Sequence, residues 1–465
     1  MLDDMLPGFS LPAIGGKKVT AAFDGGRLSS DGGVFLLAAA DQRLGLIETL
    51  AGLIPDRRDP ARVTHTMAEM VRARVFAIGC GYPDADDLDT LRRDPAFKLA
   101  CGRLPESGAD LASQPTLSRL ENAPDLRALL RLAYAMIDLW CQSHARPPRA
   151  ITLDIDDTLD VVHGHQSLSL FNAHYDERCF LPIHVYEAES GHCVATILRP
   201  GKTPDGREVR GHLRRLIRRI RTHWPETRIT VRGDSHYGRP EAMAWCETND
   251  VSYLFGLATN KALAARVEPA ADAVRVRRAV NDLDRVREHI EFPYAAGSWP
   301  QARRVVARIE ATRRGLDVRY VVTNVTHCPP HWLYASLYCA RGQAENLIKR
   351  HKSQLASDRT SCRSPLANQM RLILHTAAYW LMRMIAHAIP KPQPLACAEF
   401  STIRSCLLKV ALRVRESASR VHLAFAANWP EAVLFRGFCG VCCRVQPECR
   451  GRCPDRPSAC TTANA

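Results

Sequence analysis

Apolar and polar residues alternate along Ile151-Thr-Leu-Asp-Ile-Asp-Asp-Thr-Leu159, and this segment indicates the fold class of the chain. Alternation with a period of two is typical of a β-strand, whose successive side chains point to opposite faces. The aliphatic residues would therefore face a core, whereas Asp154 and Asp156 would share the opposite face. The helical spacing of the preceding residues ends here, so this strand marks a change of fold class along the chain.

Downstream of this strand, helices and strands alternate. The pattern predicts strands at Phe180–Tyr186 and His192–Leu198, a strongly basic helix at Gly211–Trp224, a strand at Arg228–Arg232, a helix near Glu241–Thr248 and a strand at Ser252–Gly256. Three strands, a helix, a strand, a helix and a strand is an α/β order that favours a mixed sheet.

The rest of the chain divides into regions of different character. Apolar residues at helical spacing predict helices from about residue 28 to 145. A charged helical piece near Asp282–His289, β-like runs from Arg303 and Asp317, and then helices to about residue 425 are also expected. We therefore predict a mostly helical N-terminal region (1–147), a core (148–261 and 331–425), a β-rich insertion (262–330) and a disordered Cys-, Arg- and Pro-rich tail (426–465).

The tail also carries cysteines at spacings that suit zinc. Cys439-Gly-Val-Cys442 has the spacing of a zinc knuckle, and Cys449-Arg-Gly-Arg-Cys453 is a possible partner pair. Apolar residues are sparse there, so a disordered basic tail is preferred and a small zinc site is the alternative.

Acidic residues lie at the carboxyl ends of two predicted strands. Asp156 ends the first, and Asp234 ends the strand Val231-Arg-Gly-Asp-Ser. Ligands of open α/β sheets gather at these ends. Glu345 would join them from a helix packed on the sheet. Three such carboxylates repel one another unless cations neutralise them, and oxygen-only ligands favour Mg²⁺ or Mn²⁺.

Two such ions about 4 Å apart can activate a water or a 3′-hydroxyl and stabilise the leaving oxygen of a phosphodiester. The alternative is that Asp154 and Asp156 begin a loop and that Asp234 caps the following helix.

A late helix places charged groups at regular intervals. Tyr338, Arg341, Glu345 and Lys352 stand at relative positions 0, 3, 7 and 14, which a regular helix brings within a wedge of roughly 60°. A carboxylate flanked by cations suits a metal ion that holds phosphates. The alternative is a solvated face with ordinary i,i+4 pairs.

Composition narrows the class of partner. The chain has 465 residues, a formal net charge of +14 and a pI of about 9.2, which favours a polyanion such as nucleic acid. No signal peptide is indicated, and Leu372–Ile389 is interrupted by charged and histidine residues, so it reads as a buried helix. Seventeen cysteines without a secretory signal indicate a reducing compartment. We expect a cytoplasmic protein with no membrane partner.

Several motifs together resemble one family. They are Leu153-Asp-Ile-Asp-Asp-Thr158, His163-Gly-His-Gln166, Phe171-Asn-Ala-His-Tyr-Asp-Glu-Arg-Cys-Phe-Leu-Pro182, Leu198-Arg-Pro-Gly201, Arg232-Gly-Asp-Ser-His-Tyr237, Trp245-Cys-Glu247, Gly256-Leu-Ala-Thr-Asn260 and the Tyr-(2)-Arg-(3)-Glu-(6)-Lys helix from Tyr338 to Lys352. From about Ser29 to Pro390 the sequence resembles the DDE transposases of bacterial insertion sequences, in particular the insertion-sequence thirteen-eighty family.

The resemblance implies an RNase H-like catalytic core with a β-rich insertion before the last acidic residue. It implies Asp156, Asp234 and Glu345 as catalytic, metal-binding residues with two Mg²⁺ or Mn²⁺ ions, and Asp154 stays an alternative ligand because it shares a face with Asp156. Many relatives have Gly-Phe at the position of His236-Tyr237, which we interpret as variation in a supporting loop.

DNA contacts are expected from several cations. The resemblance implies that Tyr338, Arg341 and Lys352 hold phosphates near the cut. Lys349 on the same helix, and Arg199 and Arg232 at the border of the site, are further candidates. Arg119 would project from a helix capped by Ser113 or Thr116, as a DNA-contacting helix does.

Two other features leave alternatives open. His163 and His165 are interpreted as structural or substrate-contacting residues in preference to metal ligands. The Arg214–Arg221 helix either touches the DNA backbone or is a solvated outer helix of the core.

The expected function is that of a transposase. It would cut the inverted-repeat ends of its element and transfer the 3′-hydroxyl strands into target DNA, as a homodimer that associates with the nucleoid when bound. The alternatives are a catalytically inactive, transposase-derived DNA-binding protein and a stand-alone RNase H-like nuclease.

Overall fold

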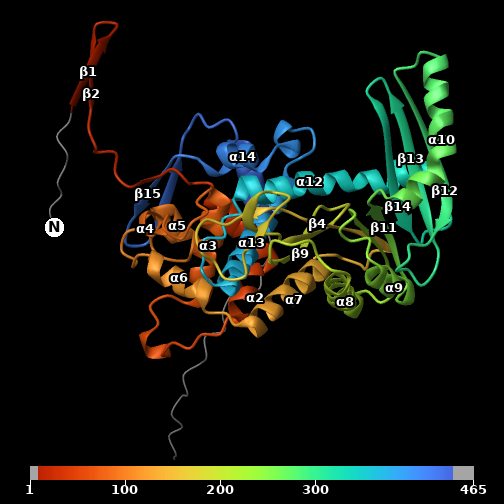
Figure 1. Ribbon diagram of the computed structural model, residues 1–465. Coiled ribbons are helices and arrows are strands. Elements are labelled where there is room, and N and C mark those ends of the chain that lie inside the picture. The colour runs from red at the N-terminus through yellow and green to blue at the C-terminus, as the bar shows by residue number, and fades with distance from the viewer. Residues whose placement is uncertain (1–8, 443–465) are drawn as a thin grey trace, which may run out of the picture.

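The computed structural model describes residues 9–442 (Figure 1). Helices occupy most of residues 34–142, as the apolar spacing predicts. Its helices are α1 (Val34–Leu44), α2 (Leu46–Leu53), the 3₁₀ turn η1 (Pro60–Arg62), α3 (Met67–Cys80), α4 (Leu88–Leu91), α5 (Pro95–Ala100), α6 (Gln114–Asn122) and α7 (Leu126–Gln142). Local sequence explains several starts, since the side chains of Thr66, Asp94 and Asp125 accept hydrogen bonds from the first backbone N–H groups of α3, α5 and α7.

A mixed eight-stranded sheet follows, as the α/β order predicts. Its strands are β4 (Ala150–Asp157), β8 (Ile183–Glu187), β9 (Cys193–Ile197), β10 (Arg228–Gly233), β11 (Val251–Leu257), β12 (Arg285–Tyr294), β13 (Arg303–Thr312) and β14 (Gly315–Thr323). The spatial order is β12-β13-β14-β11-β10-β4-β8-β9. Strands β4, β10 and β11 run parallel, and every other neighbouring pair is antiparallel.

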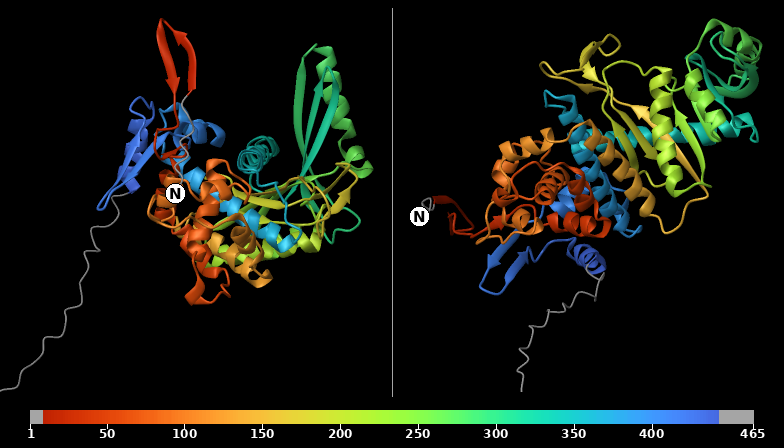
Figure 2. Two further views of the ribbon diagram at one scale, coloured as in Figure 1. Left: turned by 90° about the vertical axis from the view of Figure 1, so that its left-hand side faces the viewer. Right: turned by 90° about the horizontal axis from the view of Figure 1, so that it is seen from below.

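Helices cover both faces of this sheet (Figures 1 and 2). One face carries α7, α8 (Gly206–His223) and α9 (Pro240–Thr248), and the other carries α12 (Gly342–Lys349). The expected strand at 180–186 is divided in the structure, because β7 (Glu177–Phe180) leaves the large sheet to pair with β5 (Asp160–Val161) and β6 (Leu170–Asn172).

The insertion differs from the prediction in one element. The expected helical piece at 282–289 is wrong, since β12 begins at Arg285. The helix lies upstream, as α10 (Lys261–Val280), and packs on β12 and β13. Its buried residues Leu263, Val267, Ala271 and Val274 are spaced by three or four, a helical stripe visible in the sequence, but Pro269 inside the helix hides it.

The described ends of the chain form β-structure that was not expected. A hairpin of β1 (Phe9–Ile14) and β2 (Lys17–Ala21) projects from the body (Figure 1). The short strand β3 (Leu28–Ser29) pairs with β15 (Leu412–Glu416), which pairs with β16 (Val421–Phe425). The prediction of helix as far as residue 425 is therefore wrong from residue 412 onward.

The remaining elements are α11 (Pro330–Trp332), the π-helical turns η2 (Leu333–Tyr338), η4 (Arg350–Gln354) and η6 (Arg404–Leu408), the 3₁₀ turns η3 (Cys339–Arg341) and η5 (Pro394–Cys397), and the helices α13 (Pro365–Ala388), α14 (Phe400–Ile403) and α15 (Ala432–Cys442). Because α15 is a helix, the expectation of a disordered tail is wrong for that stretch. Residues 443–465 lie outside the described part of the chain, and with them the proposed zinc pair at 449 and 453.

Helix α13 joins the helical region to the sheet. It is buried along most of its length and packs against α3, α1, α6, α7 and β9. One cluster of buried apolar residues consequently runs from Val34 in α1, through the sheet, to Phe438 in α15. Within residues 9–442, no helix is long and apolar enough to cross a membrane.

Candidate active site

Asp156 and Asp234 lie side by side at the carboxyl ends of β4 and β10. The register of this parallel pair aligns Ile155 with Gly233, so the next residue on each strand faces the same side. Asp156 is buried and Asp234 is half-buried. Burial raises the pKa of Asp156 to about 7, Arg341 opposes this shift, and the charges of Asp234 and Asp157 add to it. The structure thus brings two of the predicted carboxylates together.

Asp154 has a different environment although it shares a face with Asp156. Its two carboxylate oxygens accept hydrogen bonds from Nε and Nη2 of Arg232, at 2.6 and 2.8 Å, and both side chains are buried. Nη1 of Arg232 donates to the carbonyl of Leu337 at 2.6 Å. The pair therefore anchors the segment that carries Tyr338, and Asp154 has no oxygen turned to an open site.

The segment from Pro330 to Gln354 is not one regular helix. It passes from α11 through the π-helical η2 and the 3₁₀ turn η3 into α12, and then into the π-helical η4. A π-turn adds a residue and a 3₁₀ turn tightens the winding, so the assumption of 100° per residue fails over this length. The prediction that four side chains share one helical face is wrong for this reason.

Three of the four residues still meet at one pocket. Tyr338, Arg341 and Glu345 line a pocket of about 600 Å³ together with Asp234. Lys352 lies elsewhere: its Nζ donates to the carbonyl of Leu159, and its side chain lines a second pocket of about 520 Å³. His163 and Gln166 line that second pocket as well, while His165 is exposed.

Arg341 lies between Asp156 and Glu345. Its Nη1 donates to Oδ2 of Asp156 at 2.7 Å, and its Nη2 is 3.7 Å from Oε1 of Glu345. The Glu345 side chain is 67% exposed, whereas Asp156 is buried. Among residues 9–442, no group of three or more His, Cys, Asp or Glu side chains is placed to hold a metal ion. Of the three predicted carboxylates, Asp156 and Asp234 therefore form a pair. Glu345 is separated from Asp156 by Arg341.

Tyr338 packs tightly against the backbone of β11. A Cβ atom at Gly256 would lie 2.8 Å from the Tyr338 hydroxyl, so only glycine allows this approach. Burial raises the pKa of Tyr338 to about 12, which keeps the hydroxyl protonated and able to donate a hydrogen bond at the edge of the pocket.

A third acidic residue at this edge, Asp157, was not among the predicted site residues. Nδ1 of His236 is 3.3 Å from both carboxylate oxygens of Asp157 and 3.8 Å from Oδ2 of Asp234. The backbone N–H of His236 donates to Oδ1 of Asp234 at 2.9 Å. The hydrogen bond with Asp157 raises the pKa of His236. A histidine two residues after the second predicted carboxylate was the signal available in the sequence.

The other predicted DNA contacts have varied positions. Arg199 is buried, where Nε and Nη2 bind Glu208 at 2.8 and 2.9 Å and Nη1 donates to backbone carbonyls. Arg199 and Arg232 therefore have interior partners and do not reach a surface at which DNA could lie. Lys349 and Arg119 are exposed, and Ser113 precedes α6 without a capping hydrogen bond from its side chain.

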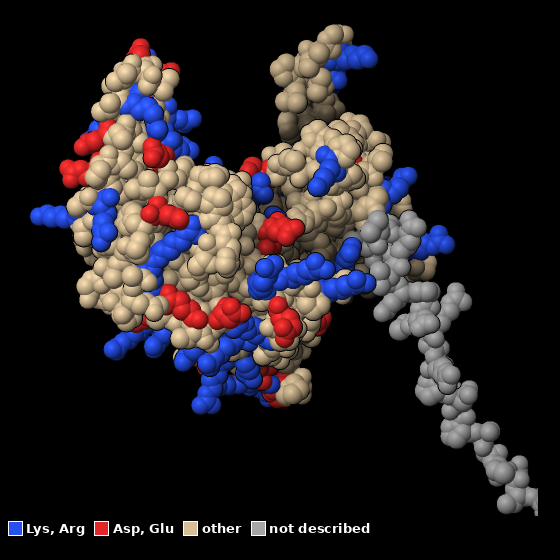
Figure 3. Space-filling model, turned by 90° about the vertical axis from the view of Figure 1, so that its right-hand side faces the viewer, with Lys and Arg blue, Asp and Glu red and all other residues tan. Residues whose placement is uncertain are grey.

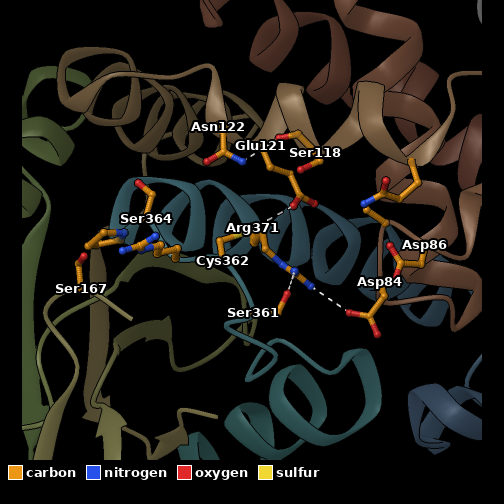
Figure 4. A pocket seen from close by; sticks show the side chains of 14 residues that line it. Asp84, Asp86, Ser118, Glu121, Asn122, Ser167, Ser361, Cys362, Ser364 and Arg371 are labelled. Atoms are coloured by element: carbon orange, nitrogen blue, oxygen red, sulfur yellow. Dashed lines mark hydrogen bonds and ion pairs between the residues drawn. The ribbon is translucent and has the colours of Figure 1, made fainter. Parts of the chain in front are cut away.

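A larger pocket, of about 870 Å³, is lined by residues of α6, of the start of α13 and of the loops beside them (Figure 4). Figure 4 shows Arg371 reaching toward Ser361 and Asp84, with a distance of 3.2 Å between Nη2 and Oδ1 of Asp84. Glu121, on the other wall, forms a buried ion pair with Arg74 at 2.9 Å. The lining contains none of the predicted catalytic carboxylates. The ion pair between Arg371 and Asp84 joins the core to the helical region, whereas the pair between Arg74 and Glu121 lies within the helical region.

One comparison with known proteins shows the family of this chain. A family described as "Transposase DDE domain group 1" matches residues 11–445. No curated protein matches the sequence. One similar solved structure is described as "Cryo-EM structure of piggyBac transposase synaptic complex with hairpin DNA (SNHP)", which is 12% identical over 81% of this chain and 79% of that chain, with a TM-score of 0.40. Because the family match spans nearly the whole sequence, this chain belongs to the Transposase DDE domain group 1 family.

Proposed function

We propose that this protein is a DNA transposase of the bacterial insertion-sequence thirteen-eighty type. It cuts the inverted-repeat ends of its element and joins the 3′-hydroxyl strands to target DNA. The observation that carries this proposal is the placement of Asp156 and Asp234 on adjacent parallel strands, with Asp234 lining one pocket together with Tyr338, Arg341 and Glu345. Family membership supports the same function.

The proposed architecture assigns a role to each region. Strands β4, β8, β9, β10 and β11 with helices α8, α9 and α12 constitute the RNase H-like catalytic core. Helix α10 with β12, β13 and β14 is the insertion, which enters the chain between Asp234 and Glu345. The helices before residue 148 contact DNA, with Arg119 of α6 exposed for that purpose.

The carboxylates fit a divalent cation by their chemistry. Asp156 and Asp234 offer only oxygen donors, as Mg²⁺ and Mn²⁺ prefer, and the charge of Asp234 contributes to the raised pKa of Asp156. Asp156 and Asp234 would hold the metal, and Glu345 would complete the site. When bound, two such ions supply neutralising charge and polarise phosphate and water oxygens.

The residues of the chain have further tasks. The pKa of Asp156 is about 7, so this carboxyl can act as a ligand only after it loses its proton. The guanidinium of Arg341 compensates the negative charge of the deprotonated form. Arg341, Tyr338, Lys349 and Lys352 are the proposed phosphate contacts. His236 holds Asp157 and Asp234 in place from the following loop.

The proposed partners are double-stranded transposon ends and target DNA. Two ends must be held together for a complete reaction, so we propose a homodimer in the DNA complex. A cytoplasmic location with nucleoid association on DNA follows from that function.

The test is strand cleavage and joining with Mg²⁺, using a plasmid that carries the coding region with its flanking DNA. The parent protein should excise the element and yield joined target DNA, whereas Asp156→Asn, Asp234→Asn and Glu345→Gln should reduce both products by a factor of at least 10³. Glu268→Gln removes an exposed carboxylate on α10 and should leave the products unchanged.

Each other outcome points to a different protein. Cleavage without joined products would show a stand-alone nuclease. Binding of the end DNA without any metal-dependent cleavage would show an inactive DNA-binding protein. Equal activity of the parent and the three carboxylate variants would reject the assignment of the site.

A further inference from the structure

The outer surface of α8 carries a row of arginines. Arg207, Arg210, Arg214 and Arg218 are all exposed, and spacings of three, four and four residues place them within roughly 80° of one another around the helix. The row is about 16 Å long, from the rise of 1.5 Å per residue. We call these four residues the α8 arginine row.

The opposite side of α8 fixes this orientation. Val209, Leu213, Leu216, Ile217 and Ile220 are buried in the core under the sheet. The helix cannot roll without exposing them, so the four guanidinium groups are held on the outer surface. Lys and Arg side chains gather along the lower edge of the molecule in Figure 3, the level at which Figure 1 places α8.

Two of the acidic residues near this helix are bound by other cations. Glu208 accepts from the buried Arg199, and Asp138 accepts from Arg219 and His223. Within residues 9–442, none of the four row arginines forms a side-chain hydrogen bond or an ion pair. Their charge is therefore uncompensated at the surface.

Four exposed arginines of the insertion, by contrast, are paired. On the insertion, Arg275, Arg277, Arg287 and Arg313 contact Asp272, Glu288, Glu310 and Asp284 respectively. Alternating charges of that kind are typical of a solvated surface. The α8 arginine row lacks this compensation, as a surface for a polyanion does.

The row lies on the opposite side of the sheet from the candidate active site. Asp154 and Asp156 face the side covered by α12, whereas α8 covers the side to which Leu153 and Val231 point. A duplex bound along the row is therefore not the segment whose phosphate reaches Asp156 and Asp234.

We propose that the α8 arginine row binds a second segment of double-stranded DNA through its phosphates, without reading its sequence. DNA carries one phosphate per 3.4 Å along each strand, so a 16 Å row spans about five phosphates of one strand. This inference rests on the proposed function only for the identity of the polyanion.

The test is binding of a 30-base-pair duplex of random sequence at several salt concentrations, measured by fluorescence anisotropy. The variant Arg207→Gln, Arg210→Gln, Arg214→Gln and Arg218→Gln should lose about three to four units of the slope of log K against log salt, and at least tenfold in affinity at low salt. The control Arg275→Gln, Arg277→Gln, Arg287→Gln and Arg313→Gln makes the same change in net charge and should lose less than about one unit.

Equal losses in the two variants would overturn the proposal, because the effect would then come from net charge alone. A row-dependent binding of phosphatidylserine vesicles without row-dependent DNA binding would overturn it as well. A photo-crosslinking amino acid at position 214 should join to the duplex, and one at position 313 should not.

The assay contains no transposon ends and no Mg²⁺, so it measures DNA binding by the α8 arginine row independently of catalysis. If the carboxylate variants fail to abolish cleavage while the row variant loses its salt slope, the proposed function fails and the DNA surface stands. If instead the carboxylate variants abolish cleavage while the row variant keeps its salt slope, the proposed DNA surface fails and the proposed function stands.

Discussion

Asp154 and Asp156 lie two residues apart on β4 and face the same side of the sheet, yet their partners differ. Asp154 accepts hydrogen bonds from Nε and Nη2 of the buried Arg232, whereas Asp156 contacts Arg341 beside Asp234. The sequence predicted their shared face from strand alternation. It did not separate a structural aspartate from a candidate ligand, because the partner Arg232 is 78 residues away.

Loss of the Asp154 carboxylate should destabilise the fold. Asp154→Ala leaves the buried Arg232 without its counter-charge, which costs about 3 to 5 kcal/mol in the free energy of unfolding, measured by urea denaturation. The double variant Asp154→Leu with Arg232→Met should recover part of this loss, because no charge then stays buried. If Asp154→Ala unfolds with the same urea midpoint as the parent protein, the ion pair has no structural role.

The raised pKa of Asp156 should make stability depend on pH. Burial raises this pKa from 3.8 to about 7 in the folded chain, so the contribution of Asp156 to stability falls as the pH rises from about 4 to 7. Asp156→Asn removes the dependence. In the presence of a chelator, the stability of the variant relative to the parent should increase by on the order of 2 kcal/mol between pH 5 and pH 8.

Urea denaturation at the two pH values measures this difference. Asp272→Asn, which replaces an exposed carboxylate on α10, serves as the control and should follow the parent. The account of Asp156 is contradicted if Asp156→Asn also follows the parent across the range.

Among the elements, long and strongly periodic segments were predicted best. Helices α3 and α7 and strands β4, β10 and β11 lie where the apolar spacing placed them. The winding of residues 333–354 was not predictable, because an inserted π-turn leaves no pattern of its own and depends on tertiary contacts. One such contact is the hydrogen bond from Arg232 to the carbonyl of Leu337.

A glycine at the start of α1 shows how closely two distant elements pack. A Cβ atom at Gly33 would lie 1.9 Å from the carbonyl oxygen of Leu407, and both atoms belong to backbone. Gly33→Ala should therefore destabilise the fold by about 2 kcal/mol or more, measured as a shift in the unfolding midpoint. Gly52 in α2 has no atom within 4 Å of an added Cβ, so Gly52→Ala should stabilise by about 0.5 to 1 kcal/mol. Equal midpoints for the two variants would contradict this packing.

At the scale of the whole molecule, the helical region and the sheet share one core. A boundary is predicted at residue 147, where the apolar spacing changes from helical to strand-like. The structure changes from helix to strand between α7 and β4. The packing of α13 against α1 and α3 across that boundary was not predictable, because it joins segments about 300 residues apart whose apolar faces carry no mark of their partners. The pairing of β3 with β15 is unpredicted for the same reason.

The shared core makes the position of the carboxylate pair a property of the whole molecule. Strands β4 and β10 are held between α8 and α9 on one face and α12 on the other, and α13 fixes the sheet to the helical region. A divalent ion at Asp156 and Asp234 would therefore bind at the edge of a well-packed sheet. Glu345 and Arg341 come from the less regular segment 333–354.

Iron-promoted cleavage of the polypeptide locates such an ion without any DNA substrate. Fe²⁺ bound in place of Mg²⁺, with ascorbate and peroxide, generates radicals that cut the backbone nearby, and mass spectrometry maps the cuts. Cuts are expected within residues 154–157 and 233–236, and excess Mg²⁺ should suppress them and Asp234→Asn should abolish them. Cuts confined to other parts of the chain, or cuts at these strands that persist unchanged in Asp234→Asn, would contradict binding of the ion at Asp156 and Asp234.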